Sequence, residues 1–251
     1  MAPVSLPRLH WGNPDAPLKA LMIHGLGSSA HTCWQVMEAL AEHGWSATAV
    51  DLRGHGMAPR SSSYRIEDFA DDLIHTTPEG STSWDLVIGH SIGAASAVVA
   101  SAESPDWAKR LVLIDPALEL DDQGREMVLE NQRLGHLRQT VDEVKELNPH
   151  WHPLDWELKI KANRSASLFA LEHAVFDNNP WNVTDKALAL VVPTHVIGGD
   201  PEKGSMFFGE YAKALLTANS LMSYQMVEGA GHSVHRDKPR EVIEAILRFV
   251  A

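Results

Sequence analysis

Short apolar runs alternate with amphipathic stretches along most of the chain, starting near residue 19. Apolar runs of this length predict buried strands, and apolar residues spaced three and four apart predict helices. The expected strands are 19–24, 46–52, 86–88, 111–114, 191–197 and 224–227, and the expected helices are 32–42, 66–74, 92–102, 211–216 and 239–250. Because strands and helices alternate, we expect an α/β fold: a doubly wound, mostly parallel sheet flanked by helices.

Residues 118–182 interrupt this alternation, because they contain no convincing strand and are rich in tryptophan, proline and histidine. A connection of this length rarely lacks structure of its own in a compact domain. We therefore expect a helical lid at 118–182, inserted into a core domain formed by residues 1–117 and 183–251.

Charge and composition narrow the classes of partner. The 251 residues include 21 basic and 33 acidic ones, and the net charge of −12 disfavours binding to nucleic acid or an anionic membrane surface. The single cysteine, Cys33, excludes an intrachain disulfide and a cysteine-rich zinc site.

We expect a cytoplasmic protein, because no apolar run suits a secretory leader or a membrane span. No histidine pair has the helical spacing of a common zinc motif, so we expect no metal.

The clearest chemical signal is Gly89-His90-Ser91-Ile92-Gly93, which lies between an expected strand and an expected helix. In this G-x-S-x-G context the turn is so sharp that the positions two before and two after the serine must lack side chains. The turn raises the serine oxygen above the sheet at the start of a helix. We therefore interpret Ser91 as a nucleophile.

Together with this elbow, three further segments make the chain resemble the α/β-hydrolase superfamily over about residues 18–251. They are HGLGSS at 24–29, DLRGHG at 51–56 and GAGH at 229–232. The resemblance implies that the lid follows the sixth core strand, here 111–114. It also implies a general base at His232 and an oxyanion hole formed by the backbone N–H groups of Leu26 and Ile92. A rival base, His235, is more simply interpreted as a surface residue.

The acidic member of the expected triad stays open between two main candidates. The resemblance places it shortly after the glycine that ends the seventh strand, and residues 197–204 there contain Asp200 and Glu202. Asp200 comes early for the usual spacing, whereas Glu202 fits that spacing when counted from Gly199. Asp115, at the end of the expected strand 111–114, is the minor alternative, since a few relatives carry the acid there.

The expected activity is that of a serine hydrolase, which cleaves a small carboxylic ester or related acyl compound through an acyl-enzyme. His24, His90 and the lid residue Trp151 are the expected substrate contacts, and an apolar lid implies a substrate with an apolar portion. We expect no cofactor. The alternatives are a cofactor-free carbon–carbon bond hydrolase, lyase or perhydrolase using the same triad, or a non-enzymatic ligand receptor. The oligomeric state is not determined by these patterns.

Overall fold

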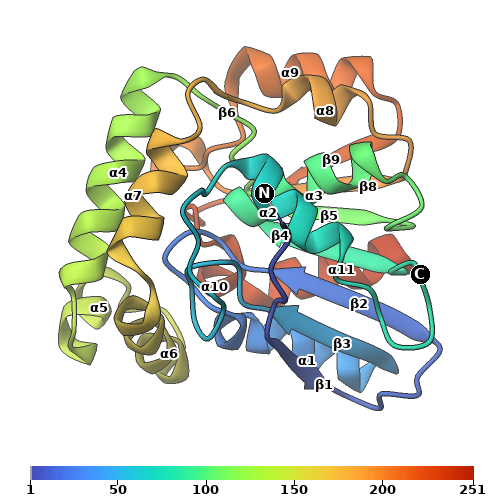
Figure 1. Cartoon of the computed structure of the whole chain (residues 1–251), viewed down its shortest axis with the longest axis horizontal. Coiled ribbons are helices and arrows are strands. Elements are labelled where there is room, and N and C mark those ends of the chain that lie inside the picture. Colours follow the sequence, from blue (N-terminus) through green and yellow to red (C-terminus); the bar gives the residue numbers. More distant parts are fainter. Residues whose placement is uncertain (1) are drawn as a thin grey trace.

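The computed structural model describes residues 2–251 and contains a seven-stranded sheet (Figure 1). In the order in which they lie across the sheet, the strands are β1 (Arg8–Trp11), β3 (Trp45–Val50), β2 (Leu18–Ile23), β4 (Leu86–His90), β5 (Leu111–Ile114), β8 (Thr194–Gly198) and β9 (Met222–Met226). All neighbouring strands pair in parallel except β1, which pairs antiparallel with β3 at one edge. The expected fold class is confirmed.

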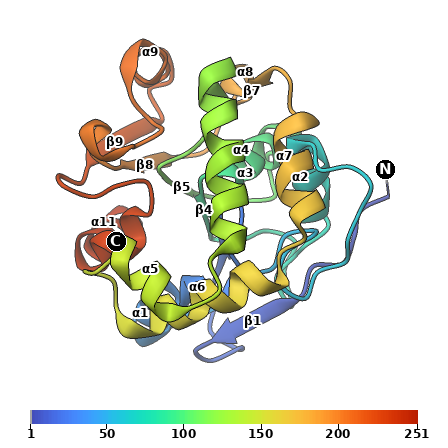
Figure 2. The ribbon, with the colours of Figure 1, turned by 90° about the vertical axis from the view of Figure 1, so that its left-hand side faces the viewer.

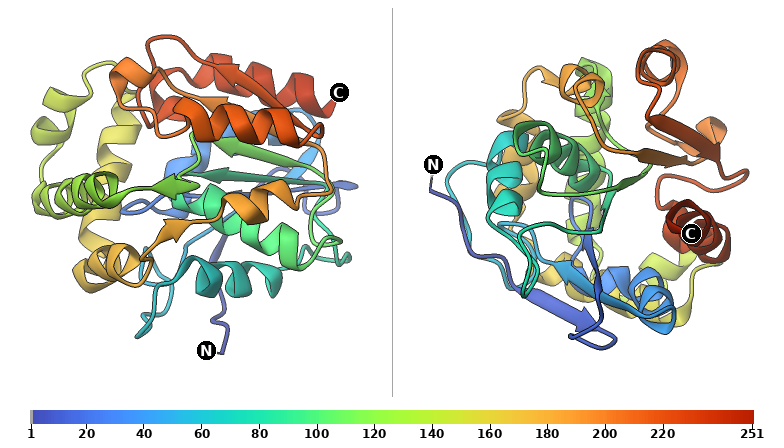
Figure 3. Two further views of the ribbon diagram at one scale, coloured as in Figure 1. Left: turned by 90° about the horizontal axis from the view of Figure 1, so that it is seen from above. Right: turned by 90° about the vertical axis from the view of Figure 1, so that its right-hand side faces the viewer.

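Both faces of the sheet are buried, and successive strand residues point to opposite sides. In β5, Leu111 and Leu113 pack in one hydrophobic cluster, while Val112 and Ile114 pack in the other. Helices α2 (Ile66–Ile74), α3 (Ile92–Glu103), α8 (Thr184–Leu188) and α9 (Gly209–Ala218) cover the first face, and α1 (Trp34–Glu42) and α11 (Pro239–Val250) cover the second. Figure 3 shows the sheet between these helix layers. This double burial explains why the strands appear in the sequence as continuous apolar runs.

Residues 118–182, hereafter the helical insertion, lie beside the carboxyl ends of the parallel strands (Figures 1 and 2). Its helices are α4 (Asp122–Leu137), α5 (Val141–Leu147), α6 (Pro153–Ser165) and α7 (Leu168–Phe176). At its two ends, β6 (Glu119–Leu120) and β7 (Trp181–Asn182) pair antiparallel and close the insertion at its base. The insertion follows β5, the strand after which the sequence placed it; this strand is the fifth of this chain, whereas the resemblance counts it as the sixth.

Several elements differ from the expectation for local physical reasons. The pattern did not predict β1, because this short edge strand is only partly buried and has mixed polarity. Strand β8 begins at Thr194 rather than at 191, because Val191 is exposed and Pro193 has no N–H to donate to a neighbouring strand. Within residues 2–251, no helix combines the length and apolarity needed to cross a membrane.

Candidate active site

Ser91 sits at the turn between β4 and α3, in a backbone conformation that is rare for a residue with a side chain. Its φ of 55° lies in the left-handed region, where non-glycine residues are strained. A Cβ atom at Gly89 would lie 2.5 Å from the Ala94 Cα, and one at Gly93 would lie 2.4 Å from the His24 carbonyl oxygen. The two glycines are therefore needed for space, as the G-x-S-x-G interpretation requires.

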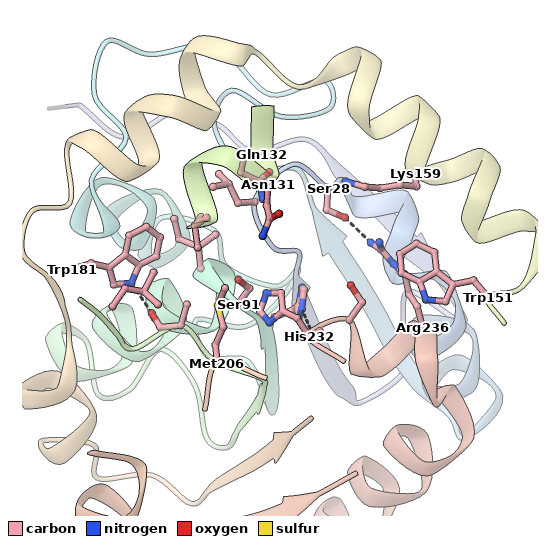
Figure 4. A pocket seen from close by; sticks show the side chains of 17 residues that line it. Ser28, Ser91, Asn131, Gln132, Trp151, Lys159, Trp181, Met206, His232 and Arg236 are labelled. Atoms are coloured by element: carbon pink, nitrogen blue, oxygen red, sulfur yellow. Dashed lines mark hydrogen bonds between the residues drawn. The ribbon is translucent and has the colours of Figure 1, made fainter. Parts of the chain in front are cut away.

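A cavity of about 160 Å³ opens over this turn (Figure 4). Ser91 and His232 both line it, together with the two residues expected to form the oxyanion hole, Leu26 and Ile92. Ser91 is only 8 % exposed, so a substrate must enter the cavity to reach its hydroxyl. The structure thus brings into one cavity two residues that lie 141 positions apart and that the sequence predicts to be nucleophile and base.

The acid beside His232 is Asp115, at the carboxyl end of β5. Its Oδ2 atom accepts a hydrogen bond from His232 Nδ1 at 2.7 Å and another from the Met206 N–H at 2.9 Å. Its Oδ1 atom accepts from the Ser205 hydroxyl and more weakly from the Gly199 and Phe207 N–H groups. Burial would raise the pKa of Asp115, but the hydrogen bonds from His232 and Ser205 outweigh it and hold the pKa below its ordinary value. Asp115 is therefore a buried carboxylate that fixes the imidazole.

The expectation of Asp200 or Glu202 in this position is wrong. Asp200 caps the short 3-10 helix Pro201–Lys203, where its side chain accepts hydrogen bonds from the Glu202 and Gly229 N–H groups. Glu202 lies exposed on that helix. Strand β8 pairs directly with β5, so the carboxyl ends of both strands meet at the site. The chain after β8 supplies Ser205 and Met206 as donors to the acid, rather than the acid itself.

Two backbone N–H groups are free to stabilise an oxyanion. Ile92 is the first residue of α3, where an N–H has no partner within the helix. Leu26 lies in the loop after β2. Within residues 2–251, neither N–H has a hydrogen-bond acceptor. Because both residues line the cavity, they are placed to bind the charge that develops on a reacting carbonyl oxygen.

His24 does not contact the cavity, and its expected role as a substrate contact is wrong. The ring is buried; its Nδ1 donates to the Gly25 carbonyl at 2.8 Å and its Nε2 accepts from the Leu52 N–H at 3.1 Å. His55 holds the same loop, because its Nε2 accepts from the Gly27 N–H at 3.1 Å. Burial lowers the pKa of both rings, that of His55 to about 3, so both stay neutral and can accept. These two histidines fix the loop that carries the Leu26 N–H.

The other two expected substrate contacts, His90 and Trp151, do line the cavity. His90 Nε2 donates to the His232 carbonyl at 2.9 Å, which helps to position the base. His235 is not the surface residue expected from the sequence: it is buried, its ring centroid is 4.7 Å from that of His90, and burial sets its pKa well below the ordinary value. It does not line the cavity, and within residues 2–251 no hydrogen bond joins it to Asp115.

Sequence reasoning missed the polar wall of the cavity. Lys159 and Gln132 come from the helical insertion, and Arg236 comes from α10 (Val234–Asp237), just after the base. Arg236 could have been noticed from its place four residues after His232. The spacing of residues within the insertion gave no signal for Lys159.

Comparisons with known proteins agree with the fold described above. The sequence profile of the Alpha/beta hydrolase family matches residues 20–245. The chain is similar to a putative esterase/lipase of Haemophilus influenzae, at 26 % identity over 92 % of this chain and 82 % of the relative. It is also similar to an esterase of Mycobacterium tuberculosis, at 27 % identity over 95 % of this chain and 84 % of the relative. Among solved structures, E-2-(acetamidomethylene)succinate hydrolase superposes with a TM-score of 0.85 at 22 % identity, covering 98 % of this chain and 95 % of that one.

Proposed function

The chain belongs to the alpha/beta hydrolase family, and we propose that it is a serine hydrolase that cleaves a small carboxylic ester or a related acyl compound. The observation that carries the proposal is that a strained Ser91 and His232 line one cavity, and that the His232 imidazole is hydrogen-bonded to Asp115 at 2.7 Å. The esterase names of the two curated relatives support the choice of ester over other acyl bonds.

In the proposed reaction, His232 Nε2 removes the proton from the Ser91 hydroxyl as the oxygen attacks the substrate carbonyl. The Leu26 and Ile92 N–H groups stabilise the resulting oxyanion. Asp115 keeps the Nδ1 proton of His232 in place and stabilises the imidazolium. His232 then gives its proton to the departing alcohol oxygen, which leaves an acyl group on Ser91.

The second half of the reaction repeats these roles with water. His232 removes a proton from a water molecule, whose oxygen attacks the acyl carbon, and the same N–H groups stabilise the second oxyanion. The bond to Ser91 then breaks, Ser91 takes the proton back from His232, and the acid product leaves. Every proton transfer uses a residue that lines the cavity or contacts one that does.

The cavity suits a small molecule, because its volume of about 160 Å³ over Ser91 is modest for a ligand site. In Figure 4, Trp181 and Met206 lie on one side of Ser91 and His232. Leu120 and Val128 also line the cavity and pack in the same hydrophobic cluster as Trp181 and Met206. This side suits an apolar part of the substrate.

Turnover of p-nitrophenyl esters, from acetate to decanoate, tests the proposal. We expect the wild type to release nitrophenol with a preference for short acyl chains, and the Ser91→Ala variant to be inactive. Ser104→Ala, at the far end of α3, is the matched control and should behave as wild type. Equal turnover by Ser91→Ala and wild type would refute the assignment of Ser91 as nucleophile.

A further inference from the structure

Two cationic side chains, Lys159 and Arg236, line the cavity, and no acidic side chain is among the 17 residues that line it. The chain as a whole has a net charge of −12, so a purely cationic wall here runs against its overall charge. Figure 4 shows both cations on the opposite side of the Ser91–His232 pair from Trp181. The cavity is therefore divided into an apolar side and a cationic side.

Arg236 is buried without a counter-ion. It is 5 % exposed, its Nη2 donates to the Ser28 hydroxyl at 2.7 Å, and its Nε is buried without an acceptor within residues 2–251. Its guanidinium lies 5.0 Å from the centre of the Trp151 ring. Within the same residues, no carboxylate lies within salt-bridge distance of it. A buried charge is normally paired, because removing it from water is costly.

The two carboxylates whose charges act on Arg236, Asp155 and Asp237, are already bound by other donors. Asp155 accepts from the Trp34 indole at 2.9 Å and from the Gln35 amide at 2.8 Å. Asp237 accepts from the Trp151 indole at 2.6 Å and from the Gly231 N–H at 2.7 Å. Both therefore influence Arg236 only through space. The Arg236 guanidinium therefore keeps N–H donors, including Nε–H, that a ligand in the cavity could bind.

Lys159, on α6, is half-buried and also lacks a counter-ion in the described part of the chain. Its Nζ donates to the Gly27 carbonyl at 2.8 Å, and within residues 2–251 it forms no ion pair. Burial lowers the pKa of Lys159 to about 7, and the charges of Arg236 and Arg138 add to this effect. A bound anion would relieve that repulsion. Gly27 and Ser28, which the two cations contact, directly follow Leu26 of the expected oxyanion hole.

We infer that Arg236 and Lys159 form a subsite for a carboxylate of the substrate, so that the preferred substrate is an ester that carries a free acid group close to the scissile carbonyl. This inference rests on the proposed function for the choice of scissile bond. A guanidinium and an ammonium suit a single carboxylate, whose charge is shared by two oxygens. The apolar side of the cavity would receive the uncharged part of the same molecule.

Matched pairs of substrates test this subsite. Monoethyl glutarate and ethyl 4-carbamoylbutanoate differ only by a carboxylate and its neutral amide on the acyl side, and 4-acetoxybutanoate and 4-acetoxybutanamide differ likewise on the alcohol side. For at least one pair we expect wild-type kcat/KM, measured by acid release in a pH-stat, to be about 10- to 100-fold higher for the acid. The pair that shows the preference identifies the side of the ester that faces Arg236.

The variants Arg236→Gln and Lys159→Gln should lower the ratio of kcat/KM for acid over amide, with Arg236→Gln bringing it close to one. The exposed neighbours provide the matched controls, since Arg240→Gln and Lys161→Gln also remove one charge each and should keep the wild-type ratio. The ratio is used because it is insensitive to a general loss of active protein.

Binding to the Ser91→Ala variant gives a readout that needs neither turnover nor a substitution in the subsite. Isothermal titration calorimetry with the same four esters should show about 10-fold or tighter binding of the preferred acid over its amide. If wild type hydrolyses acids and amides equally and Ser91→Ala binds them equally, the subsite is refuted while the proposed function stands. If wild type hydrolyses none of the esters but Ser91→Ala binds the acid selectively, the proposed function fails while the subsite stands.

Discussion

Replacing Asp115 by asparagine tests the triad at its buried end. The three donors around Oδ1, from Gly199, Ser205 and Phe207, would hold the amide oxygen on their side. The amide NH₂ group would then face His232 Nδ1 and the Met206 N–H, which now donate to Oδ2. Donor would meet donor, so His232 would be forced into the tautomer that carries its proton on Nε2. In that tautomer the ring cannot accept the proton of Ser91.

The expected loss is large because this geometry leaves no compensating arrangement. Asparagine in place of a triad aspartate lowers kcat by about 10⁴-fold in serine proteases, which corresponds to about 5.5 kcal/mol of activation free energy. We expect a loss of kcat between about 10³- and 10⁴-fold for Asp115→Asn. Because the carboxylate is completely buried, we also expect about 1–3 kcal/mol lower stability from the new donor–donor contact.

The assay is steady-state hydrolysis of a p-nitrophenyl ester, with circular dichroism to confirm that the variant is folded. Asp200→Asn is the matched control, since it makes the same chemical change in the carboxylate first expected to be the acid. We expect it to change kcat by less than about threefold. A folded Asp115→Asn with near wild-type kcat, or a large loss in Asp200→Asn alone, would refute the assignment.

Three further predictions concern stability. Burial lowers the pKa of His55 to about 3, whereas in the unfolded chain its ordinary pKa is about 6.5. Between these two values the unfolded chain binds a proton at His55 and the folded chain does not. The free energy of unfolding should therefore fall as the pH is lowered from about 6.5 towards 3. His55→Gln should reduce that slope by about 1.4 kcal/mol per pH unit between pH 4 and 5.5 in urea titrations, and an unchanged slope would contradict the assignment of a neutral ring. Gly93→Ala should abolish activity or prevent folding, because the new Cβ would lie 2.4 Å from a backbone oxygen. Gly135→Ala, with open space around its Cβ, is the control and should be neutral or stabilising by up to about 1 kcal/mol. Equal melting temperatures and activities for the two variants would count against the elbow geometry. Asp72→Ala should lower the free energy of unfolding in denaturant by about 3–5 kcal/mol, because the buried Arg53 guanidinium loses the carboxylate that it contacts at 2.7 Å. A loss below about 1 kcal/mol would mean that this ion pair does not stabilise the fold.

The features that sequence reasoning predicted correctly are those encoded locally. The position of Ser91 at a strand–helix turn follows from two glycines and two apolar segments, all within a short stretch of chain. The doubly covered sheet follows from apolar runs that need no knowledge of their partners. Family resemblance then added His232, which the structure places in the same cavity as Ser91.

The features that were missed depend on contacts between distant segments. Asp115 follows β5 and His232 follows β9, and they meet because β8 lies between these two strands and pairs with both. Local spacing after β8 could not show which carboxylate points at the imidazole. His24 binds the Leu52 N–H across two loops, so its burial is invisible in its own segment. Lys159 reaches Gly27 from 132 residues away. Each of these contacts is set by tertiary packing rather than by local pattern.

The central claim is that Ser91 is an activated nucleophile, and covalent labelling tests it most directly. A fluorophosphonate reacts with serines that an adjacent base activates; intact-mass spectrometry counts the adducts, and mass spectrometry of a digest locates them. We predict that wild type gains a single adduct on the peptide that contains Ser91, that Asp115→Asn is labelled far more slowly, and that Ser91→Ala gains none. Absence of any adduct on folded wild type, or an adduct on a different residue, would contradict the account.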